Sequence, residues 1–183
     1  MSPSLHSARL VLRPLELADA KQTQQLFPHW EIVRFLSRVP WPYPENGALQ
    51  YFRDVALPAI ERGDSWQWTL RLKRNPQQLI GLISLTRDET KNRGFWLGLP
   101  WHGQGLMTEA ADVATDYWFN QLGFSVMRIP KAVANIASRR ISEKQGMRVV
   151  AVEEKDYVGG RFLTEIWQIT AEEWRARRRK QML

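Results

Sequence analysis

The sequence contains no cysteine and only three histidines. Without cysteine, disulfide bonds, thiolate nucleophiles and cysteine-ligated metal sites are all excluded. His6, His29 and His102 make a poor set of ligands for a transition metal, so we expect no metal site. The chemistry of this chain must then depend on oxygen and nitrogen groups.

Long apolar runs are also missing. No stretch approaches the ~20 apolar residues of a membrane-spanning helix, and residues 1–9 lack the apolar core of a signal peptide. We therefore expect a cytoplasmic protein without a membrane partner, either a monomer or a homodimer. The 183 residues are 44% hydrophobic, with nine Trp, which is sufficient for one domain with a sizeable core.

The net charge of +7 is partly concentrated at the C-terminus. Residues 171–183 hold five basic and two acidic side chains, a net +3. This pattern is typical of a solvated helix whose basic end suits the helix dipole, which is the interpretation we favour. The alternative is an electrostatic footprint for nucleic acid.

The first 100 residues predict strands and helices in alternation. We expect a strand over residues 8–13, a helix within 16–27, a stiff proline-rich connector over 40–44, and a helix over 45–62 with a kink or stop at Pro58. Alternating residues 66–73 and the apolar run 79–85 predict a β-hairpin with its turn at Asn75-Pro76 and a central second strand. Another strand follows over residues 94–99.

The rest of the chain predicts a helix after the glycine-rich turn, a strand over 126–134, a helix over 136–145, and strands over 148–153 and 162–169. The first of these helices carries Ala110, Val113, Ala114, Tyr117 and Trp118 on one face. Thr170 and Glu173 form a capping box that begins the last helix. This order indicates an α+β domain around one mostly antiparallel sheet. We expect a single domain over residues 1–183, with a core over about 8–170 and the basic helix over 171–183.

A glycine-rich turn, Trp101-His102-Gly103-Gln104-Gly105-Leu106-Met107-Thr108-Glu109-Ala110, lies between a predicted strand and a helix. Gly103 and Gly105 let the backbone turn tightly and approach a ligand. The free N–H groups of the first helical turn favour an anion such as a pyrophosphate. The pattern is neither a Walker A motif nor a dinucleotide fingerprint, and alone it is as typical of a plain turn.

A second segment, residues 135–147, begins where a strand gives way to a helix. Asn135 and Ser138 stand three residues apart, and Gly146 ends the helix. Taken alone, this is a capped helix in which Asn135 satisfies a backbone N–H group.

Together, the two segments resemble the GNAT superfamily of N-acetyltransferases, in the branch with the ribosomal-protein N-terminal alanine and serine acetyltransferases. The resemblance rests on Gly94-Phe95-Trp96-Leu97, on residues 101–110, and on Asn135-Ile136-Ala137-Ser138 with Glu143-Lys144-Gln145-Gly146-Met147. Arg9-Leu10-Val11-Leu12-Arg13-Pro14 is similar to the first strand of that branch. The likeness extends from residue 8 to about residue 170. It implies a GNAT fold, a central mostly antiparallel mixed sheet with helices on both faces.

The resemblance also implies an activity. Such enzymes transfer an acyl group, here expected from acetyl-CoA, by direct attack of a neutral amine on the thioester. Ser138 is the implied catalytic acid for the departing thiolate. The implied coenzyme-binding residues are the strand edge Phe95, Trp96 and Leu97, the turn residues Gly103, Gln104, Gly105, Met107 and Thr108, and Asn135.

Three positions depart from the superfamily's pattern. Ser142 stands where many members carry a tyrosine acid, which moves the expected role to Ser138. Met107 is bulkier than usual, but a backbone N–H group can still bind there. Asn92 replaces the acid often found before the Gly-Tyr-Trp run, so the general base is not assigned.

Other candidates have plainer interpretations. Glu109 is expected to order the glycine turn, Glu31 to be an exposed acid, and Glu165 either to enter the site or to form a salt bridge. His102 either binds phosphate or is an ordinary surface residue. Four aromatic residues either line an acceptor cleft or belong to the core, which is the commoner case: Trp41, Tyr43, Trp66 and Trp68.

The acceptor favoured by the resemblance is the N-terminal α-amine of a peptide or protein, with proximity to the ribosome. The alternative is a small amine such as an amino acid, a polyamine or an aminoglycoside. A prediction of another class is a nucleic-acid or ribosome-binding module without catalysis, based on the net charge of +7. Residues 30–43 and 65–74 hold few acids, which argues against a polycationic acceptor.

Overall fold

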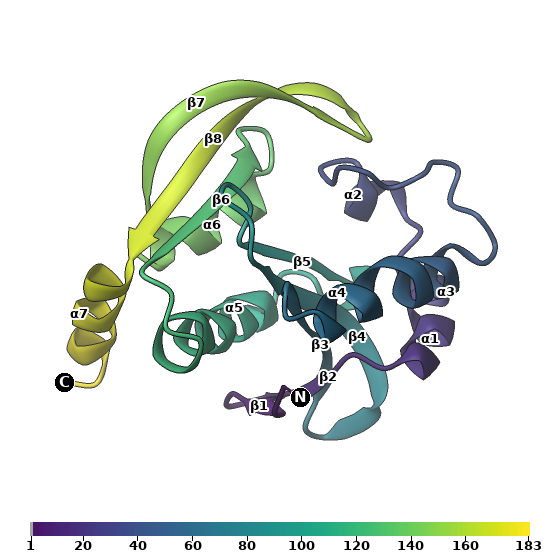
Figure 1. Cartoon of the computed structure of the whole chain (residues 1–183), viewed down its shortest axis with the longest axis horizontal. Coiled ribbons are helices and arrows are strands. Elements are labelled where there is room, and N and C mark those ends of the chain that lie inside the picture. Colours follow the sequence, from purple (N-terminus) through teal and green to yellow (C-terminus); the bar gives the residue numbers. More distant parts are fainter. Residues whose placement is uncertain (1) are drawn as a thin grey trace.

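A computed structural model describes residues 2–183, and its strands form two antiparallel sheets (Figure 1). The first sheet has the order β1-β2-β3-β4-β5 and the second the order β6-β8-β7. The strands are β1 (Leu5–His6), β2 (Leu10–Pro14), β3 (Ser65–Leu72), β4 (Asn75–Thr86), β5 (Arg93–Leu97), β6 (Val126–Ala132), β7 (Arg148–Tyr157) and β8 (Gly160–Thr170). The α+β class is confirmed. The sequence predicts one sheet, and the structure divides it between β5 and β6.

The helices lie between these strands in chain order. They are η1 (Leu17–Asp19), α1 (Ala20–Leu26), α2 (Trp30–Val33), α3 (Gly47–Tyr51), η2 (Phe52–Ala56), α4 (Leu57–Glu61), η3 (Leu99–Trp101), α5 (Leu106–Asp116), η4 (Tyr117–Gln121), α6 (Ile136–Lys144) and α7 (Ala171–Gln181). Within residues 2–183, no helix combines the length and the apolar character that a bilayer crossing requires.

β4 is covered on both faces, as its apolar sequence predicts. Leu79 and Leu82 belong to a cluster with residues of α1, α3 and η2. Ile83 and Leu85 point the other way and pack with residues of α5, in the cluster that also holds Trp68 of β3. Because side chains alternate between the faces of a strand, one central strand supports two hydrophobic layers.

Two local predictions need correction. The β3–β4 turn is Lys73-Arg74 rather than Asn75-Pro76, because Asn75 already pairs with Leu72. Pro58 does not stop its helix. The preceding turn, η2, is a π-helix, and the chain continues as α4 to Glu61. Because proline has no backbone N–H group, it interrupts the hydrogen bonds of a regular α-helix. The wider π turn before Pro58 takes up this interruption, so the helix can continue.

The β7–β8 hairpin is longer than the sequence predicts and curves out from the second sheet toward α2 (Figure 1). At its tip, the N–H groups of Val158 and Gly159 donate to the carbonyls of Leu36 and Arg34, at 2.8 and 2.9 Å. The rings of Phe35 and Phe162 also meet edge to face. The hairpin is thereby attached to the segment after α2.

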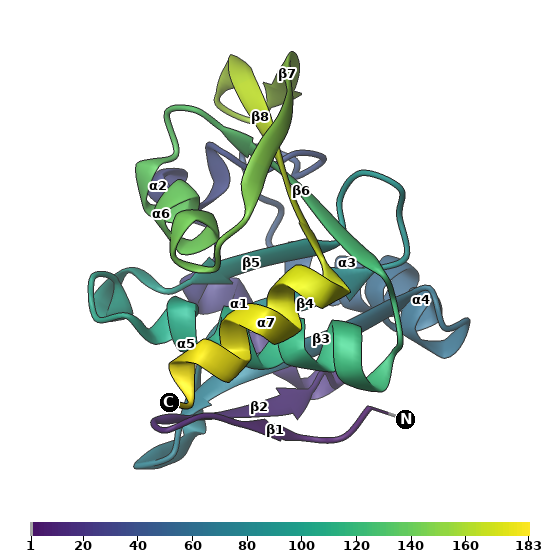
Figure 2. The same cartoon turned by 90° about the vertical axis from the view of Figure 1, so that its left-hand side faces the viewer.

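The last helix, α7, begins with the predicted Thr170–Glu173 capping box and lies beside α5 and η4 (Figure 2). Trp174 is buried and donates from Nε1 to Asp116 at 2.8 Å. Arg178 pairs with the same carboxylate at 2.8 Å, and Arg175 donates to the Phe119 carbonyl at 3.0 Å. Several of the basic side chains predicted to be solvated therefore anchor the helix to the core.

Candidate functional site

β5 presents one free edge toward β6. The N–H of Gly98 donates to the carbonyl of Ile80 at 2.8 Å, which fixes the alternation of hydrogen-bonded pairs along β4 and β5. By that alternation, the backbone groups of Trp96 face β4, whereas those of Phe95 and Leu97 face the free edge. An extended ligand with amide groups can pair there as an added strand.

β5 and β6 meet at one point, before β5 begins. The N–H of Asn92 donates to the Arg128 carbonyl at 2.9 Å, and the Asn92 Oδ1 accepts from the Arg128 N–H at 2.8 Å. The Asn92 amide nitrogen donates to the carbonyls of Thr86 and Asp88. From this joint, β6 rises away from β5 (Figure 2). An aspartate could not donate these bonds, so the joint itself explains the asparagine.

The glycine-rich turn lies at the other end of β5. Gly103 and Gly105 have φ of +76° and +77°, and Gly105 is the N-cap residue of α5. In the part of the chain that the structure describes, no acceptor is recorded for the N–H groups of Gly103, Gln104 and Gly105. Met107 turns its side chain into the core. The turn therefore offers backbone donors, as an anion site requires.

Glu109 holds this turn against the first two strands. Its carboxylate accepts from the Ser7 hydroxyl at 2.8 Å, from the Arg9 N–H at 3.0 Å, and from the Arg9 guanidinium. Arg9 also donates to the Gln104 carbonyl at 2.9 Å. Burial alone would raise the pKa of Glu109, but these hydrogen bonds and the charge of Arg9 lower it on balance. The structure agrees with an ordering role for Glu109.

Ser138 and Asn135 lie at the start of α6, next to β6. The Asn135 side chain accepts from the Ser138 N–H at 3.4 Å, so Asn135 caps the helix. The Ser138 hydroxyl is half-buried and accepts from the Lys131 ammonium at 2.5 Å. Coenzyme binding by Asn135 and proton donation by Ser138 stay predictions.

Lys131 is the residue of this site that sequence reasoning missed. It is buried on β6, on the same face as Met127 and Ile129, and its ammonium lies 5.0 Å from the centroid of the Phe95 ring. Burial lowers the pKa of Lys131 well below its ordinary 10.5, and the charge of Arg93 lowers it further. A signal was present, because a lysine at an apolar-face position of a strand indicates a buried charge.

Arg93, the first residue of β5, is a second buried cation. It donates to Thr115 Oγ1 at 2.8 Å and to Gln145 Oε1 at 2.7 Å. Two of its nitrogens, Nε and Nη2, have no partner among residues 2–183. Burial lowers its pKa to about 10, although Asp112 raises it. The diverging strands β5 and β6 therefore enclose excess positive charge.

The remaining candidates divide between structural and undetermined roles. Glu165 forms a salt bridge with Arg139 at 2.7 Å, one of its two predicted roles. His102 donates from Nε2 to the Leu97 carbonyl at 2.6 Å, at the free edge of β5. Trp68 is buried in the core, whereas Trp41 is exposed and lies against Trp30, with the ring centroids 5.8 Å apart and the rings tilted by 50°.

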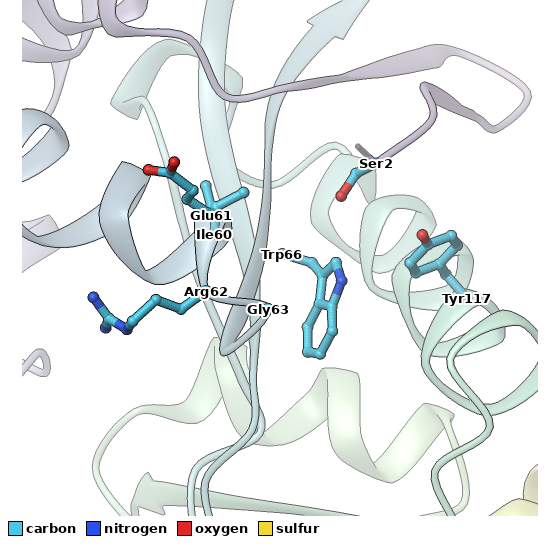
Figure 3. A pocket seen from close by; sticks show the side chains of 7 residues that line it. All are labelled: Ser2, Ile60, Glu61, Arg62, Gly63, Trp66 and Tyr117. Carbon is cyan, nitrogen blue, oxygen red and sulfur yellow. The ribbon is translucent and has the colours of Figure 1, made fainter.

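Two surface hollows lie away from these residues. One, of about 310 Å³, is shown in Figure 3 and is lined by Ser2, Ile60, Glu61, Arg62, Gly63, Trp66 and Tyr117. Arg62 extends away from the side that holds Trp66 and Tyr117. The other, of about 440 Å³, is lined by residues of α1 and α3 and of the segments before these helices. Neither includes a residue of the glycine turn, the β5 edge or α6.

Comparison with known proteins gives a consistent result. The model of the acetyltransferase (GNAT) domain family matches residues 9–148. A relative, the probable N-acetyltransferase YjcK of Bacillus subtilis (strain 168), is 23% identical over 164 residues, which cover 83% of this chain and 87% of that protein.

Solved structures share the fold. The ribosomal-protein-S5-alanine acetyltransferase from Vibrio fischeri superposes with a TM-score of 0.79 at 15% identity, over 94% of this chain and 99% of that one. RimL, a ribosomal L7/L12 α-N-protein acetyltransferase in complex with coenzyme A, gives 0.78 at 15% identity, over 92% and 98%.

The buried ammonium of Lys131 predicts a pH-dependent stability. The unfolded chain holds this proton up to about pH 10.5 and the folded chain loses it earlier, so the free energy of unfolding rises with pH between the two pKa values, by up to ~1.4 kcal/mol per pH unit. Lys131→Met removes this contribution. In urea unfolding, the free energy of unfolding of Lys131→Met minus that of the wild type should therefore fall as the pH rises toward 10.5.

Lys73→Met, which removes an exposed lysine in the β3–β4 turn, is the matched control and should leave the slope unchanged. Parallel stability curves for wild type and Lys131→Met would contradict a buried charge at Lys131.

Proposed function

Because the chain belongs to the acetyltransferase (GNAT) family, we propose that it transfers the acetyl group of acetyl-CoA to a primary amine, with a peptide or protein N-terminal α-amine as the favoured acceptor. The family and the N-acetyltransferase activity predicted from the sequence motifs are confirmed. The acceptor class and the roles of individual residues are proposed below from the geometry of the site.

The observation that carries the proposal is the free edge of β5 beside the glycine turn. The N–H groups of Phe95 and Leu97 face this edge, so the amides of pantetheine can extend along them as a strand. The backbone N–H and C=O groups of Trp96 face β4, so Phe95 and Leu97 are the favoured contacts for pantetheine. The turn then receives the pyrophosphate, through backbone N–H groups of Gly103, Gln104, Gly105, Met107 and Thr108.

The surroundings of Ser138 support a role for this residue. Its half-buried hydroxyl accepts from Lys131 of β6, and the Lys131 ammonium lies 5.0 Å from the centroid of the Phe95 ring on β5. Acetyl-CoA supplies the activated acetyl group when bound. Ser138 would then give its proton to the departing sulfur, and Asn135 would hold the helix start in place by its cap to the Ser138 N–H.

The charges near the hairpin tip bear on the acceptor. Four basic residues come from three segments here: Arg34 and Arg38 follow α2, Lys91 precedes β5, and Lys155 lies on β7. Partial desolvation lowers the pKa of Lys91, and the charges of Lys155 and Arg38 lower it further, although Asp88 raises it. A polyamine would be repelled here, so a neutral or anionic acceptor that offers one α-amine is favoured.

The non-catalytic alternative, a nucleic-acid or ribosome-binding module, has less support. Its main argument is the basic C-terminal segment, but Arg175 and Arg178 bond to η4 and α5, and Arg177 donates to the Lys144 carbonyl. Exposed guanidinium groups are what phosphate contacts require. The structural neighbours that act on ribosomal proteins keep a ribosomal acceptor open.

Acceptor choice can be tested by following thiol release from acetyl-CoA. We expect peptides with a free N-terminus to be acetylated, and the same peptides with a blocked N-terminus to be inert even when they contain lysine. An α-amine has a pKa near 8 and is partly neutral at pH 7, whereas a lysine-type amine near 10.4 is not. Preferential turnover of spermidine or an aminoglycoside would show that the acceptor is wrongly assigned. If calorimetry detects no binding of acetyl-CoA at millimolar concentration, the proposed use of acetyl-CoA as acetyl donor is wrong.

Gly103 tests the coenzyme site. Gly103→Ala places a side chain at a φ of +76°, which should lower the free energy of unfolding by ~1–2 kcal/mol. Rearrangement of the turn should also weaken acetyl-CoA binding by roughly 10-fold or more, because hydrogen bonds to a charged group are lost. Gly63→Ala is a matched control, since Gly63 has a φ of +77° and, like Gly103, space for a Cβ. Equal affinities in the two variants would place the pyrophosphate elsewhere.

Ser138→Ala tests the proton donor. We expect kcat to fall by about 10²-fold, the usual contribution of a positioned acid, while the Kd for acetyl-CoA stays unchanged. Ser142→Ala, one turn later on the same helix, is the control, because the Ser142 hydroxyl is buried and has no hydrogen-bond partner among the described residues. If Ser138→Ala leaves kcat unchanged, water supplies the proton.

A further inference from the structure

Lys131 is a buried cation for which the known activity gives no role. Its side chain is 4% exposed, and within residues 2–183 it has no salt bridge. Its ammonium donates to the Ser138 carbonyl at 2.9 Å and to the Ser138 hydroxyl at 2.5 Å, and it faces the Phe95 ring. A buried charge without a counter-ion costs several kcal/mol, so replacement by an apolar residue would be the easier solution for the fold alone.

The acids around Lys131 are already engaged. Glu165 stands opposite Lys131 in the register of β6 and β8, but its carboxylate binds Arg139 of α6. Asp112 of α5 accepts from Gln145, which in turn binds Arg93. Arg93, from β5, is the other cation that faces Lys131. Glu165 and Asp112 are thus both paired elsewhere, and Arg93 adds a like charge.

The direction of the Lys131–Ser138 hydrogen bond determines where the serine proton points. An ammonium group has donors and no acceptor, so the Ser138 hydroxyl must accept from Lys131. Its own O–H is then free to donate away from Lys131, on the half-exposed side of the residue. A hydroxyl that accepts from a cation is also polarised and becomes a stronger donor.

We propose that Lys131 is a positioning residue that supplies a proton through the Ser138 hydroxyl to the sulfur that leaves during acetyl transfer. This inference rests on the function proposed above. The two residues act as a relay, in which the buried ammonium is the source and Ser138 is the group that touches the reacting atoms. The relay explains both the burial of Lys131 and the absence of a free carboxylate beside it.

The step balances without a further reactant. The amine lone pair forms the C–N bond, and the C–S bond breaks with its electron pair going to sulfur. The Ser138 O–H proton passes to sulfur, and a Lys131 N–H proton passes to the Ser138 oxygen, which leaves a neutral lysine. The attacking nitrogen releases one proton to solvent, and solvent returns one proton to Lys131 after the product departs.

The acidities are better matched with Lys131 than without it. A serine hydroxyl alone is a weak acid, and a solution lysine near 10.4 holds its proton more tightly than a thiol of about 8.5. Burial and the charge of Arg93 bring the pKa of Lys131 down from this value. An acid close in strength to the group it protonates is the more efficient one.

The kinetic test compares Lys131→Met, Lys131→Arg and Ser138→Ala over pH 6–10. Lys131→Met should lower kcat by about 10²-fold, change the KM for acetyl-CoA less than 3-fold, and remove the alkaline limb of the kcat profile. Lys131→Arg keeps the charge but not a transferable proton, so its kcat should stay low. The double variant Ser138→Ala/Lys131→Met should be no slower than either single variant, because the two residues form one unit.

A second readout does not depend on turnover. The side-chain ¹³Cε signal of Lys131, identified by its loss in Lys131→Met, should titrate below those of the exposed lysines. Coenzyme A should raise this titration midpoint and desulfo-coenzyme A, which lacks only the sulfur, should not, because a thiolate stabilises the ammonium. In Ser138→Ala the difference between the two ligands should shrink.

The possible results distinguish failure of the Lys131–Ser138 relay from failure of the proposed acetyltransferase function. A wild-type protein that binds no acetyl-CoA and acetylates no amine would overturn both. If the wild-type enzyme turns over normally, three results would each contradict the relay but not the proposed function. These are full activity of Lys131→Arg, independent multiplication of the effects of Ser138→Ala and Lys131→Met, and an unchanged pH profile of kcat in Lys131→Met. Lys73→Met should behave as wild type in each assay, as the control for loss of one positive charge.

Discussion

Two neighbouring strands that do not pair, β5 and β6, set the constraint on which the rest of the structure depends. Each is an edge of its own sheet, and unpaired edges usually attract another strand or are covered. Here the edges are held at one end by Asn92, whose backbone and side chain bond to Arg128. The free edge of β5 is thereby kept available over a length that suits an extended ligand, with the glycine turn at its far end.

Buried positive charge also gathers between the two strands. Arg93 and Lys131 stand on facing strands, both buried, and their charges repel. Arg93 is fixed by Thr115 of α5 and by Gln145, the residue that follows α6, so both ends of this contact are held by helices. An anionic ligand between the strands would offset this repulsion. A closed sheet would bury the two cations together with no compensation, so the same residues disfavour closure and favour a ligand with negative charge.

Local patterns predicted most of the elements, and the division of the sheet escaped them for a physical reason. Alternation over residues 66–73 and the apolar run 79–85 fix which faces are buried, and they located β3 and β4 well. Periodicity says nothing about which edges pair, so one sheet was expected where two exist. The charged end of the β7–β8 hairpin shows no apolar alternation and was predicted too short. Motifs with a backbone role, such as Gly103 and Gly105, could be placed from the sequence. The strand pattern could also mark Lys131 as buried, but its contacts with Phe95 and Ser138 are visible only in the structure.

Three positions where a general base could be sought, Asn92, Glu165 and Glu109, have structural partners in the described part of the chain. Asn92 occupies the joint between the sheets and has no carboxylate, and Glu165 is held by Arg139 at 2.7 Å. Glu109 is tied to Ser7 and Arg9 at the glycine turn. Among the described residues, these three side chains therefore offer no free carboxylate, which favours an acceptor whose nitrogen is already neutral. An α-amine with a pKa near 8 satisfies this at neutral pH, whereas for an amine near 10.4 the neutral fraction falls by more than 100-fold. The proposed Lys131–Ser138 relay and the proposed α-amine acceptor would thus be two consequences of one arrangement, in which the site supplies protons to the leaving group and removes none from the nucleophile.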